Sequence, residues 1–180
     1  RSLNNYIYQK IYKMIKFFLN FLIIFFLVQN LNSEEIYGNP KIIDGDTVHI
    51  NSKKIRLEGI DAPEMRQQCQ KVFLEISAIV GFNLKKDYSC GVISKEKLID
   101  KINKSQINCV SSGRDRYKRY LATCYKDKIN LNKWMVRNGL AVAYKKYSKD
   151  YIRDEIYAKE NKLGLWKGSF IRPEKWRKLN

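Results

Sequence analysis

The stretch from Ile43 to Glu64 constrains this chain most, because it gathers carboxylates and an arginine in two short runs that are otherwise apolar. The first run reads Ile43-Asp44-Gly45-Asp46-Thr47-Val48, and the second reads Arg56-Leu57-Glu58-Gly59-Ile60-Asp61-Ala62-Pro63-Glu64. Solvated charges have little reason to gather in such runs. The pattern therefore indicates a site for a metal ion and a phosphate group.

The first run has the parity of a strand. Alternate side chains of a strand share a face, so Asp44 and Asp46 point the same way. Gly45 between them weakens a strand, and its usual reasons are a bulge or another group that approaches the backbone closely. Both features suit a site better than a plain ladder of hydrogen bonds.

The second run supplies a cation and a further carboxylate. Residues 55–60 carry apolar side chains on both faces, so Arg56 is expected to be buried and to need an anionic partner. Asp61 precedes Ala62-Pro63, which favours an extended turn from which its carboxylate can face Asp46. Two carboxylates, a backbone carbonyl and water are ligands that calcium takes, and a substrate phosphate could complete the shell.

An ordinary turn is the alternative interpretation. Asp-Gly marks a hairpin more often than a metal site, and Arg56 could pair with Glu58 or Glu64. The joint arrangement of the two runs favours the site.

At these residues the chain resembles a known family. Asp44-Gly45-Asp46-Thr47, followed by Arg56, Asp61, Pro63 and Glu64, resembles the staphylococcal nuclease (thermonuclease) family, and Asp115-Arg116-Tyr117-Lys118-Arg119 resembles its second arginine loop. The resemblance covers roughly residues 37–166, and the two motifs together are specific.

The resemblance implies an α+β fold, namely an OB-fold five-stranded β-barrel with packed helices, and hydrolysis of DNA and RNA with calcium. It implies that Asp46, Asp61 and the main-chain carbonyl of Ala62 hold the ion, with Asp44 behind them. Arg56 and Arg119 are then the phosphate clamps, and Glu64 activates or orients the attacking water. Cleavage is expected to leave 3′-phosphate ends.

The chain departs from the family pattern at two positions. Ala62 stands where the family has threonine, which is tolerable because the ligand there is a main-chain carbonyl. Lys118 stands where the family has glycine before the second arginine. If that turn requires a positive φ, the conformation of Lys118 decides where Arg119 lies.

The N-terminal segment has the layout of a secretory signal peptide. Residues 17–28 form an apolar run that is interrupted only by Asn20 and preceded by three lysines. The run is too short for a comfortable membrane span. We expect cleavage after Ser33, which would leave residues 34–180 as a domain exported to the periplasm or the cell exterior.

The start residue is a separate question. The first residue is Arg1, and Met14 would make a conventional signal start, so residues 1–13 are expected to be an artefact of start-site choice. A signal that stays uncleaved and anchors the protein to the membrane is the alternative.

The charge balance favours a polyanionic partner. Lysine and arginine number 35 against 18 acids, for a formal charge of +17. Four of the positive charges and none of the acids precede residue 34, so residues 34–180 keep +13. Nucleic acid and an anionic membrane surface are both compatible with this excess.

Four cysteines in a chain with an export signal indicate disulfides. Sequence allows three pairings. Cys109 and Cys124 are equidistant from the midpoint of a predicted hairpin, so we favour Cys109 with Cys124 and Cys69 with Cys90. Zinc is the alternative, although no C-x-x-C spacing occurs and the lone His49 lies far off in a strand.

Periodicity predicts the remaining elements. Apolar residues at helical spacing predict a helix over 68–86, and a short helix over 95–102 looks like part of an insertion spanning 87–104. Strands are expected over 106–110, 117–125 and 140–147, and helices over 131–138 and 149–163, with Ser148 as the cap of the last one.

Tyr144, Tyr147 and Tyr151 are candidates for stacking on bases, as in OB-folds that hold single strands. The basic tail after Trp166 is expected to pin the C-terminus with its charges outside. The favoured function is a monomeric calcium-dependent endonuclease that acts on single-stranded DNA or RNA and needs no stable protein partner. The rivals are a non-catalytic OB-fold module that binds single strands and a non-enzymatic basic protein attached to a membrane.

Overall fold

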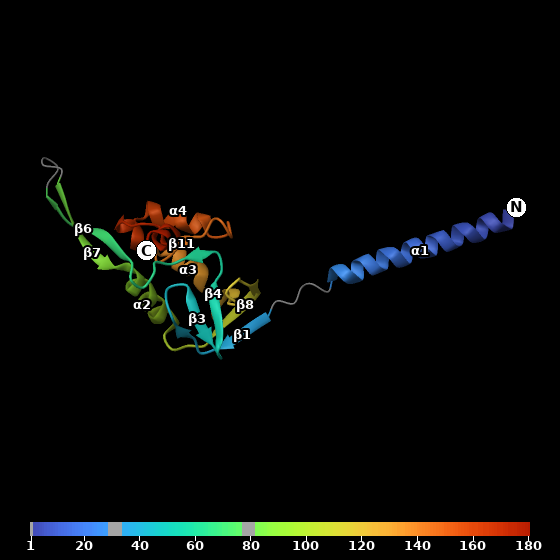
Figure 1. Cartoon of the computed structure of the whole chain (residues 1–180), viewed down its shortest axis with the longest axis horizontal. Coiled ribbons are helices and arrows are strands. Elements are labelled where there is room, and N and C mark those ends of the chain that lie inside the picture. Colours follow the sequence, from blue (N-terminus) through green and yellow to red (C-terminus); the bar gives the residue numbers. More distant parts are fainter. Residues whose placement is uncertain (1, 29–33, 77–81) are drawn as a thin grey trace. The chain divides into compact units, whose positions relative to one another are not determined.

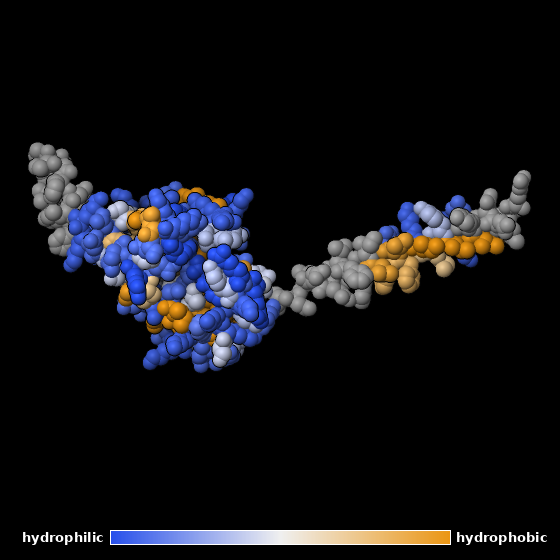
Figure 2. Space-filling model, viewed as in Figure 1, coloured by the Kyte–Doolittle hydropathy of each residue, from blue (hydrophilic) through white to orange (hydrophobic). Residues whose placement is uncertain are grey.

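The computed structural model describes residues 2–28, 34–76 and 82–180, and it divides into two units, residues 1–33 and 34–180. The first unit is the helix α1 (Ser2–Val28), which carries a row of hydrophobic side chains (Figure 2). Within the described ranges, no helix combines the length and the apolar character that a membrane crossing needs.

The second unit is built on a curled sheet (Figure 1). Its strands follow the order β1-β8-β9-β4-β3-β2, with β10 paired to β9, and only β4 and β9 run parallel. The strands are β1 (Glu34–Gly38), β2 (Lys41–Ile42), β3 (Thr47–Ile50), β4 (Lys53–Leu57), β8 (Ile107–Arg114), β9 (Tyr120–Lys126) and β10 (Ile129–Asn130). Helices pack against this sheet, so the predicted α+β fold is confirmed.

A tight turn joins β3 to β4. Asn51 and Ser52 form it, with φ values of 48° and 65°. Positive φ at both central residues belongs to the two-residue turn that matches the twist of a hairpin. This turn places Thr47 opposite Arg56, which brings the first acidic run beside the arginine.

The hairpin of β8 and β9 confirms one predicted disulfide. Cys109 and Cys124 are register partners, and their Cα atoms lie 4.0 Å apart in the disulfide. Cys69 and Cys90 form the second predicted disulfide. The first strand reaches four residues further than expected and the second begins three residues later, so the connecting loop is 115–119 and Arg119 lies just before β9.

In the described part of this unit, residues 34–76 and 82–180, four helices and several short elements accompany the sheet. They are β5 (Ile60–Asp61), α2 (Cys90–Ile102), α3 (Leu131–Arg137), β11 (Val142–Ala143), α4 (Ile152–Glu160), the 3-10 helix η1 (Gly164–Lys167), β12 (Gly168–Ser169) and α5 (Pro173–Leu179). The core lies between the sheet and these helices, and β11 pairs with β5.

The helix predicted over 68–86 is wrong. Strands β6 (Gln68–Ile76) and β7 (Phe82–Ser89) form an antiparallel hairpin there, and β12 pairs with β6. The β-branched and aromatic residues that suggested a helical stripe also favour strands. Of that stripe, Ile79 and Val80 lie outside the described residues.

Other predictions need smaller corrections. The short helix expected over 95–102 is the second half of α2, and its Leu98 and Ile102 are buried in the core. The strand expected over 140–147 shrinks to β11. The helix α4 begins later than expected, and Ser148 does not cap it, because its hydroxyl accepts a hydrogen bond from the backbone N–H of Asp150.

Candidate active site

Arg56 joins two buried carboxylates at the centre of the site. Its guanidinium donates Nη1 to Asp46 Oδ1 and Nη2 to Asp61 Oδ1, the second bond at 2.9 Å. Asp46 and Asp61 are 2% and 1% exposed, and the side chain of Arg56 is 14% exposed. The anionic partners that the sequence required for Arg56 are therefore Asp46 and Asp61, and the alternative pairing with Glu58 or Glu64 is wrong.

Short backbone elements hold these three side chains. Asp46 ends the turn before β3, Arg56 lies in β4, and Asp61 ends β5. The N–H of Leu57 donates to the carbonyl of Asp46 at 2.8 Å, and Val142 of β11 is the register partner of Asp61. The two carboxylates thus come from the turn that leads into β3 of the curled sheet and from β5, which forms a separate two-stranded sheet with β11.

Polar groups around Asp46 fix its carboxylate. The backbone N–H of Ala62 donates to Oδ2 at 2.7 Å, and the hydroxyl of Thr47 donates to Oδ1 at 3.1 Å. Asp44 Oδ1 accepts from the backbone N–H of Asp46 at 2.9 Å, so its carboxylate stabilises the turn that carries Asp46.

Gly45 explains how this turn packs so closely. A Cβ added there would lie 2.1 Å from Ser94 Oγ and 2.7 Å from the Cβ of Ala62. No side chain fits in that space. The glycine therefore serves close approach of the turn to α2 and to Ala62, as the sequence suggested.

The site holds an excess of negative charge. Burial raises the pKa of Asp46 to about 7; Arg56 and the N–H of Ala62 oppose that rise, whereas Asp44 and Asp61 add to it. Burial disfavours the charged form of Arg56, yet Asp46 and Asp61 outweigh burial and raise the pKa of Arg56. One guanidinium does not balance the carboxylates around it, so a further cation would stabilise them.

A second arginine, missed by sequence reasoning, reaches the site from the far end of the chain. Arg177 of α5 contacts Asp61 Oδ1 at 2.9 Å and Oδ2 at 3.1 Å, and Glu64 Oε1 at 2.8 Å. The expectation that the basic tail stays outside is therefore wrong for Arg177. We call Asp46, Asp61 and Glu64 the acid cluster, and each neighbouring pair in it shares an arginine.

Unlike Arg56, Arg119 pairs with an acid of its own loop, Asp115. Its guanidinium contacts Asp115 at 2.8 Å, and backbone N–H groups of Tyr117 and Arg119 also donate to Asp115. Lys118 has φ 63°, so the turn does require the left-handed conformation, and a lysine adopts it. The register places Leu121, two residues after Arg119, beside Arg56.

A cavity of about 310 Å³ opens beside Asp61. Tyr144 lines it, and Tyr147 meets Tyr144 edge to face at 4.7 Å between ring centroids. Tyr147 is 65% exposed, so its ring is accessible to a ligand. Tyr151 is 6% exposed within the core, which makes its predicted role in base stacking wrong.

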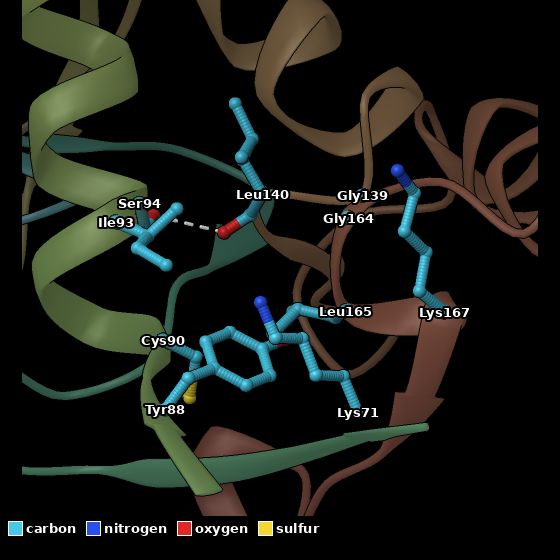
Figure 3. A pocket seen from close by; sticks show the side chains of 10 residues that line it. All are labelled: Lys71, Tyr88, Cys90, Ile93, Ser94, Gly139, Leu140, Gly164, Leu165 and Lys167. Carbon is cyan, nitrogen blue, oxygen red and sulfur yellow. Dashed lines mark hydrogen bonds between the residues drawn. The ribbon is translucent and has the colours of Figure 1, made fainter. Parts of the chain in front are cut away.

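A second cavity of about 220 Å³ lies between α2, the β6–β7 hairpin and the segments around Gly139 and Gly164 (Figure 3). The hydroxyl of Ser94 donates to the carbonyl of Leu140 at its edge, at 2.8 Å. Its lining includes Lys71 and Lys167 but no carboxylate, and it is distinct from the acid cluster.

The donor set of the acid cluster is suited to a hard cation. Across the described ranges, no three His, Cys, Asp or Glu side chains converge as they do around a bound ion. The reason is that Arg56 and Arg177 lie between the acids. Among the described residues, Asp46 Oδ2 accepts one hydrogen bond, from the N–H of Ala62, and Asp61 Oδ2 accepts one, from Arg177. A carboxylate oxygen accepts two, so one position remains on each. Calcium takes such oxygens.

Comparisons with known proteins agree with this geometry. The family model described as staphylococcal nuclease homologue matches residues 54–168, a range that includes Arg56, Asp61, Glu64 and Arg119 but neither Asp46 nor Arg177.

Individual relatives cover most of the chain. A succinoglycan biosynthesis protein, ExoI, of Rhizobium meliloti is 34% identical over 138 residues, 75% of this chain and 66% of that protein. An uncharacterized endonuclease of Haemophilus influenzae is 35% identical over 146 residues, 77% of this chain and 70% of that protein. A micrococcal nuclease of Shigella flexneri is 27% identical over 158 residues, 78% and 79% of the two chains. The chain thus spans about two thirds of the length of the first two relatives.

Proposed function

This chain belongs to the family of staphylococcal nuclease homologues, and on that premise we propose that it hydrolyses phosphodiester bonds in DNA and RNA with calcium as its cofactor. The observation that supports this most is the acid cluster itself. Asp46 and Asp61 are buried carboxylates that share Arg56, and Glu64 stands beside them with 34% of its side chain exposed. Names of relatives, an endonuclease and a micrococcal nuclease, point the same way.

The proposed mechanism divides the work among the named groups. Asp46, Asp61 and the carbonyl of Ala62 would hold calcium, which when bound polarises the phosphodiester. Arg56 and Arg119 donate to phosphate oxygens as negative charge builds up in the transition state, a role that suits their planar, permanently charged forks. Glu64 takes a proton from the attacking water or orients it. We propose 3′-phosphate ends as products.

The substrate follows from the surface beside Asp61. Tyr144, Lys145 and Lys146 line the same cavity as Asp61, and the exposed Tyr147 packs edge to face against Tyr144. Aromatic rings that stack on bases and cations that neutralise phosphates hold single strands irrespective of sequence. We therefore propose single-stranded DNA or RNA as the preferred substrate and a monomer as the working form. We also propose export after cleavage at Ser33, which N-terminal sequencing of the secreted protein tests.

One assay tests the enzymatic proposal. The full chain and its Glu64→Gln variant are incubated with single- and double-stranded DNA and with RNA, with calcium or with a calcium chelator. We expect hydrolysis by the wild type with calcium, none with the chelator, and a loss of roughly 10² or more in kcat for the variant. End labelling of the products identifies the 3′-phosphate.

The same assay identifies the rival. A wild-type protein that binds single strands but cleaves none of them in calcium would be the non-catalytic OB-fold module. Cleavage that persists undiminished in the chelator would instead remove calcium from the proposal.

A further inference from the structure

We propose that Arg177 is a positioning residue of the acid cluster, which holds Glu64 for its role in hydrolysis and opposes cation binding at Asp61. This inference rests on the proposed function, because it assigns a role within the same site. It extends beyond the family resemblance, since Arg177 lies outside the matched residues 54–168.

The start of α5 is anchored on two sides. Arg172, which precedes Pro173, donates to the carbonyl of Ala143 at 3.0 Å and pairs with the buried Glu155 at 3.0 Å. Gln67, which is 0% exposed, donates to the carbonyl of Ile171 at 2.6 Å. Proline at the first helical position suits a helix start. These contacts fix where α5 begins and therefore where its arginine reaches.

The guanidinium of Arg177 spans two acids at once. It binds both oxygens of Asp61 and one oxygen of Glu64, at 2.8 to 3.1 Å. Glu64 is a third exposed, so its carboxylate would otherwise sample several rotamers. A guanidinium that is fixed on both oxygens of Asp61 restricts that freedom and holds the Glu64 carboxylate beside Asp61. The rate of hydrolysis depends on the orientation of this carboxylate, because small misplacements of a reacting group lower rates steeply.

The same contacts occupy Asp61. Its Oδ1 accepts a hydrogen bond from Arg56 and its Oδ2 accepts one from Arg177, and Nη1 of Arg177 also lies 2.9 Å from Oδ1, so a guanidinium nitrogen faces each oxygen. The three carboxylates of the acid cluster and the two arginines have a net charge of −1. Without Arg177 the net charge would be −2. A divalent cation is drawn to negative charge and repelled by a neighbouring guanidinium. Arg177 therefore weakens cation binding while it orders Glu64.

A purely structural role for Arg177 predicts something different. If Arg177 only pinned the C-terminal helix to the sheet, its loss would lower stability, and calcium binding and turnover would fall together. Our proposal predicts opposite changes in these two quantities. The matched control is Lys178, on the same helix, whose only described ion pair is with Glu174 at 3.4 Å, outside the acid cluster.

The experiment compares the wild-type chain with Arg177→Gln, Arg177→Lys and Lys178→Gln. Calorimetric titration with calcium chloride, without nucleic acid, gives the calcium affinity, and hydrolysis of a single-stranded oligonucleotide at saturating calcium gives kcat and KM. For Arg177→Gln we expect calcium to bind roughly threefold to tenfold more tightly. We expect its kcat to fall by about tenfold or more, with a much smaller change in KM.

The other two variants separate charge from fork geometry. Arg177→Lys keeps the charge and loses the bidentate fork, so its calcium affinity should stay near that of the wild type while kcat still falls several-fold. Lys178→Gln should match the wild type in both measurements. If thermal melting shows that Arg177→Gln does not fold, Arg177→Lys still tests the proposal.

Three outcomes overturn the proposal. If Arg177→Gln binds calcium no more tightly than the wild type, Arg177 does not oppose cation binding. If kcat is unchanged in both Arg177 variants, Arg177 does not position Glu64. A wild-type protein that neither binds calcium nor cleaves nucleic acid overturns the proposed function and this inference together, which distinguishes that failure from the first two.

Discussion

Arg56 is the residue whose charge makes two buried carboxylates compatible with the folded state. It binds Asp46 and Asp61, which are 2% and 1% exposed. Replacing Arg56 with methionine leaves Asp46 without its guanidinium and Asp61 with Arg177 alone. We expect Arg56→Met to lower the free energy of unfolding by about 3–5 kcal/mol in calcium-free buffer, measured by urea denaturation.

The control for this prediction is Arg66→Met, which removes an arginine that is exposed to solvent. A double variant, Arg56→Met with Asp46→Asn, removes one of the stranded charges and should recover part of the loss. Equal destabilisation by Arg56→Met and Arg66→Met would mean that the pairing contributes nothing beyond an exposed charge.

Local sequence shows one part of this site and hides another. Asp46, Arg56 and Asp61 lie within 16 residues on short strands, so parity and a buried arginine predict that they meet. Arg177 lies 113 residues after Glu64 and 116 after Asp61, in a tail rich in lysine and arginine. Nothing in the tail marks that one guanidinium, because its selection depends on where α5 is anchored.

At the scale of elements, Glu155 ties α4 to β11 and to the start of α5. It is 1% exposed and accepts from the N–H of Ala143 at 2.8 Å and from Arg172 at 3.0 Å, with Lys145 at 3.2 Å. Burial alone would raise the pKa of Glu155, but Arg172, Lys145 and the N–H of Ala143 outweigh burial and lower it. The carboxylate therefore stabilises the fold in its charged form.

The pH dependence of stability follows from that lowered pKa. Stabilisation by Glu155 is complete above the ordinary value of 4.5 and is lost as the pH falls through the folded-state pKa. We expect Glu155→Gln to cost about 3 kcal/mol of unfolding free energy near neutral pH, and the difference from wild type to shrink in acid. Urea unfolding across that pH range measures it.

Glu160→Gln, an exposed position on the same helix, is the matched control and should have little effect at any pH. A wild-type advantage over Glu155→Gln that stays constant from neutral to acid pH would show that ionisation of Glu155 is not what holds these elements together.

The element that the sequence misrepresents most is the β6–β7 hairpin. Apolar residues from Val72 onward recur at helical spacing, yet the chain forms paired strands over Gln68–Ile76 and Phe82–Ser89. The local pattern does not contain the partners that decide between the two structures: the disulfide of Cys69 with Cys90 and the pairing of β6 with β12 at Gly168 and Ser169. By contrast, β8 and β9 were predictable because their turn formers and cysteines are symmetric about one hairpin.

At the scale of the whole molecule, the net positive charge acts on nucleic acid over long distances, whereas the acid cluster acts only on groups that contact it. The acid cluster is a small negative region in a chain with a net charge of +17, so the surface around it attracts a polyanion that the cluster alone would repel. Binding of the proposed calcium ion would change the local charge of the acid cluster from negative to positive. Long-range attraction should therefore govern binding of nucleic acid, whereas the acid cluster governs its cleavage.

Salt separates these two contributions. We expect the Kd of Glu64→Gln for a single-stranded oligonucleotide to rise at least about tenfold between about 0.05 and 0.2 M NaCl, because bound phosphates release counterions. Wild-type kcat at saturating substrate should change far less.

Lys146, exposed beside Tyr147, borders the cavity of Asp61, so adding Lys146→Gln to the Glu64→Gln background should reduce the slope of log Kd against log salt by about 0.7, the single-strand value for one phosphate contact. Adding Lys97→Gln, which removes a lysine paired with Asp100 on α2, should leave the slope unchanged. A Kd that does not vary with salt would mean that the net charge plays no part in substrate capture, and equal slopes for both lysine variants would place the bound strand away from the tyrosine-lined cavity.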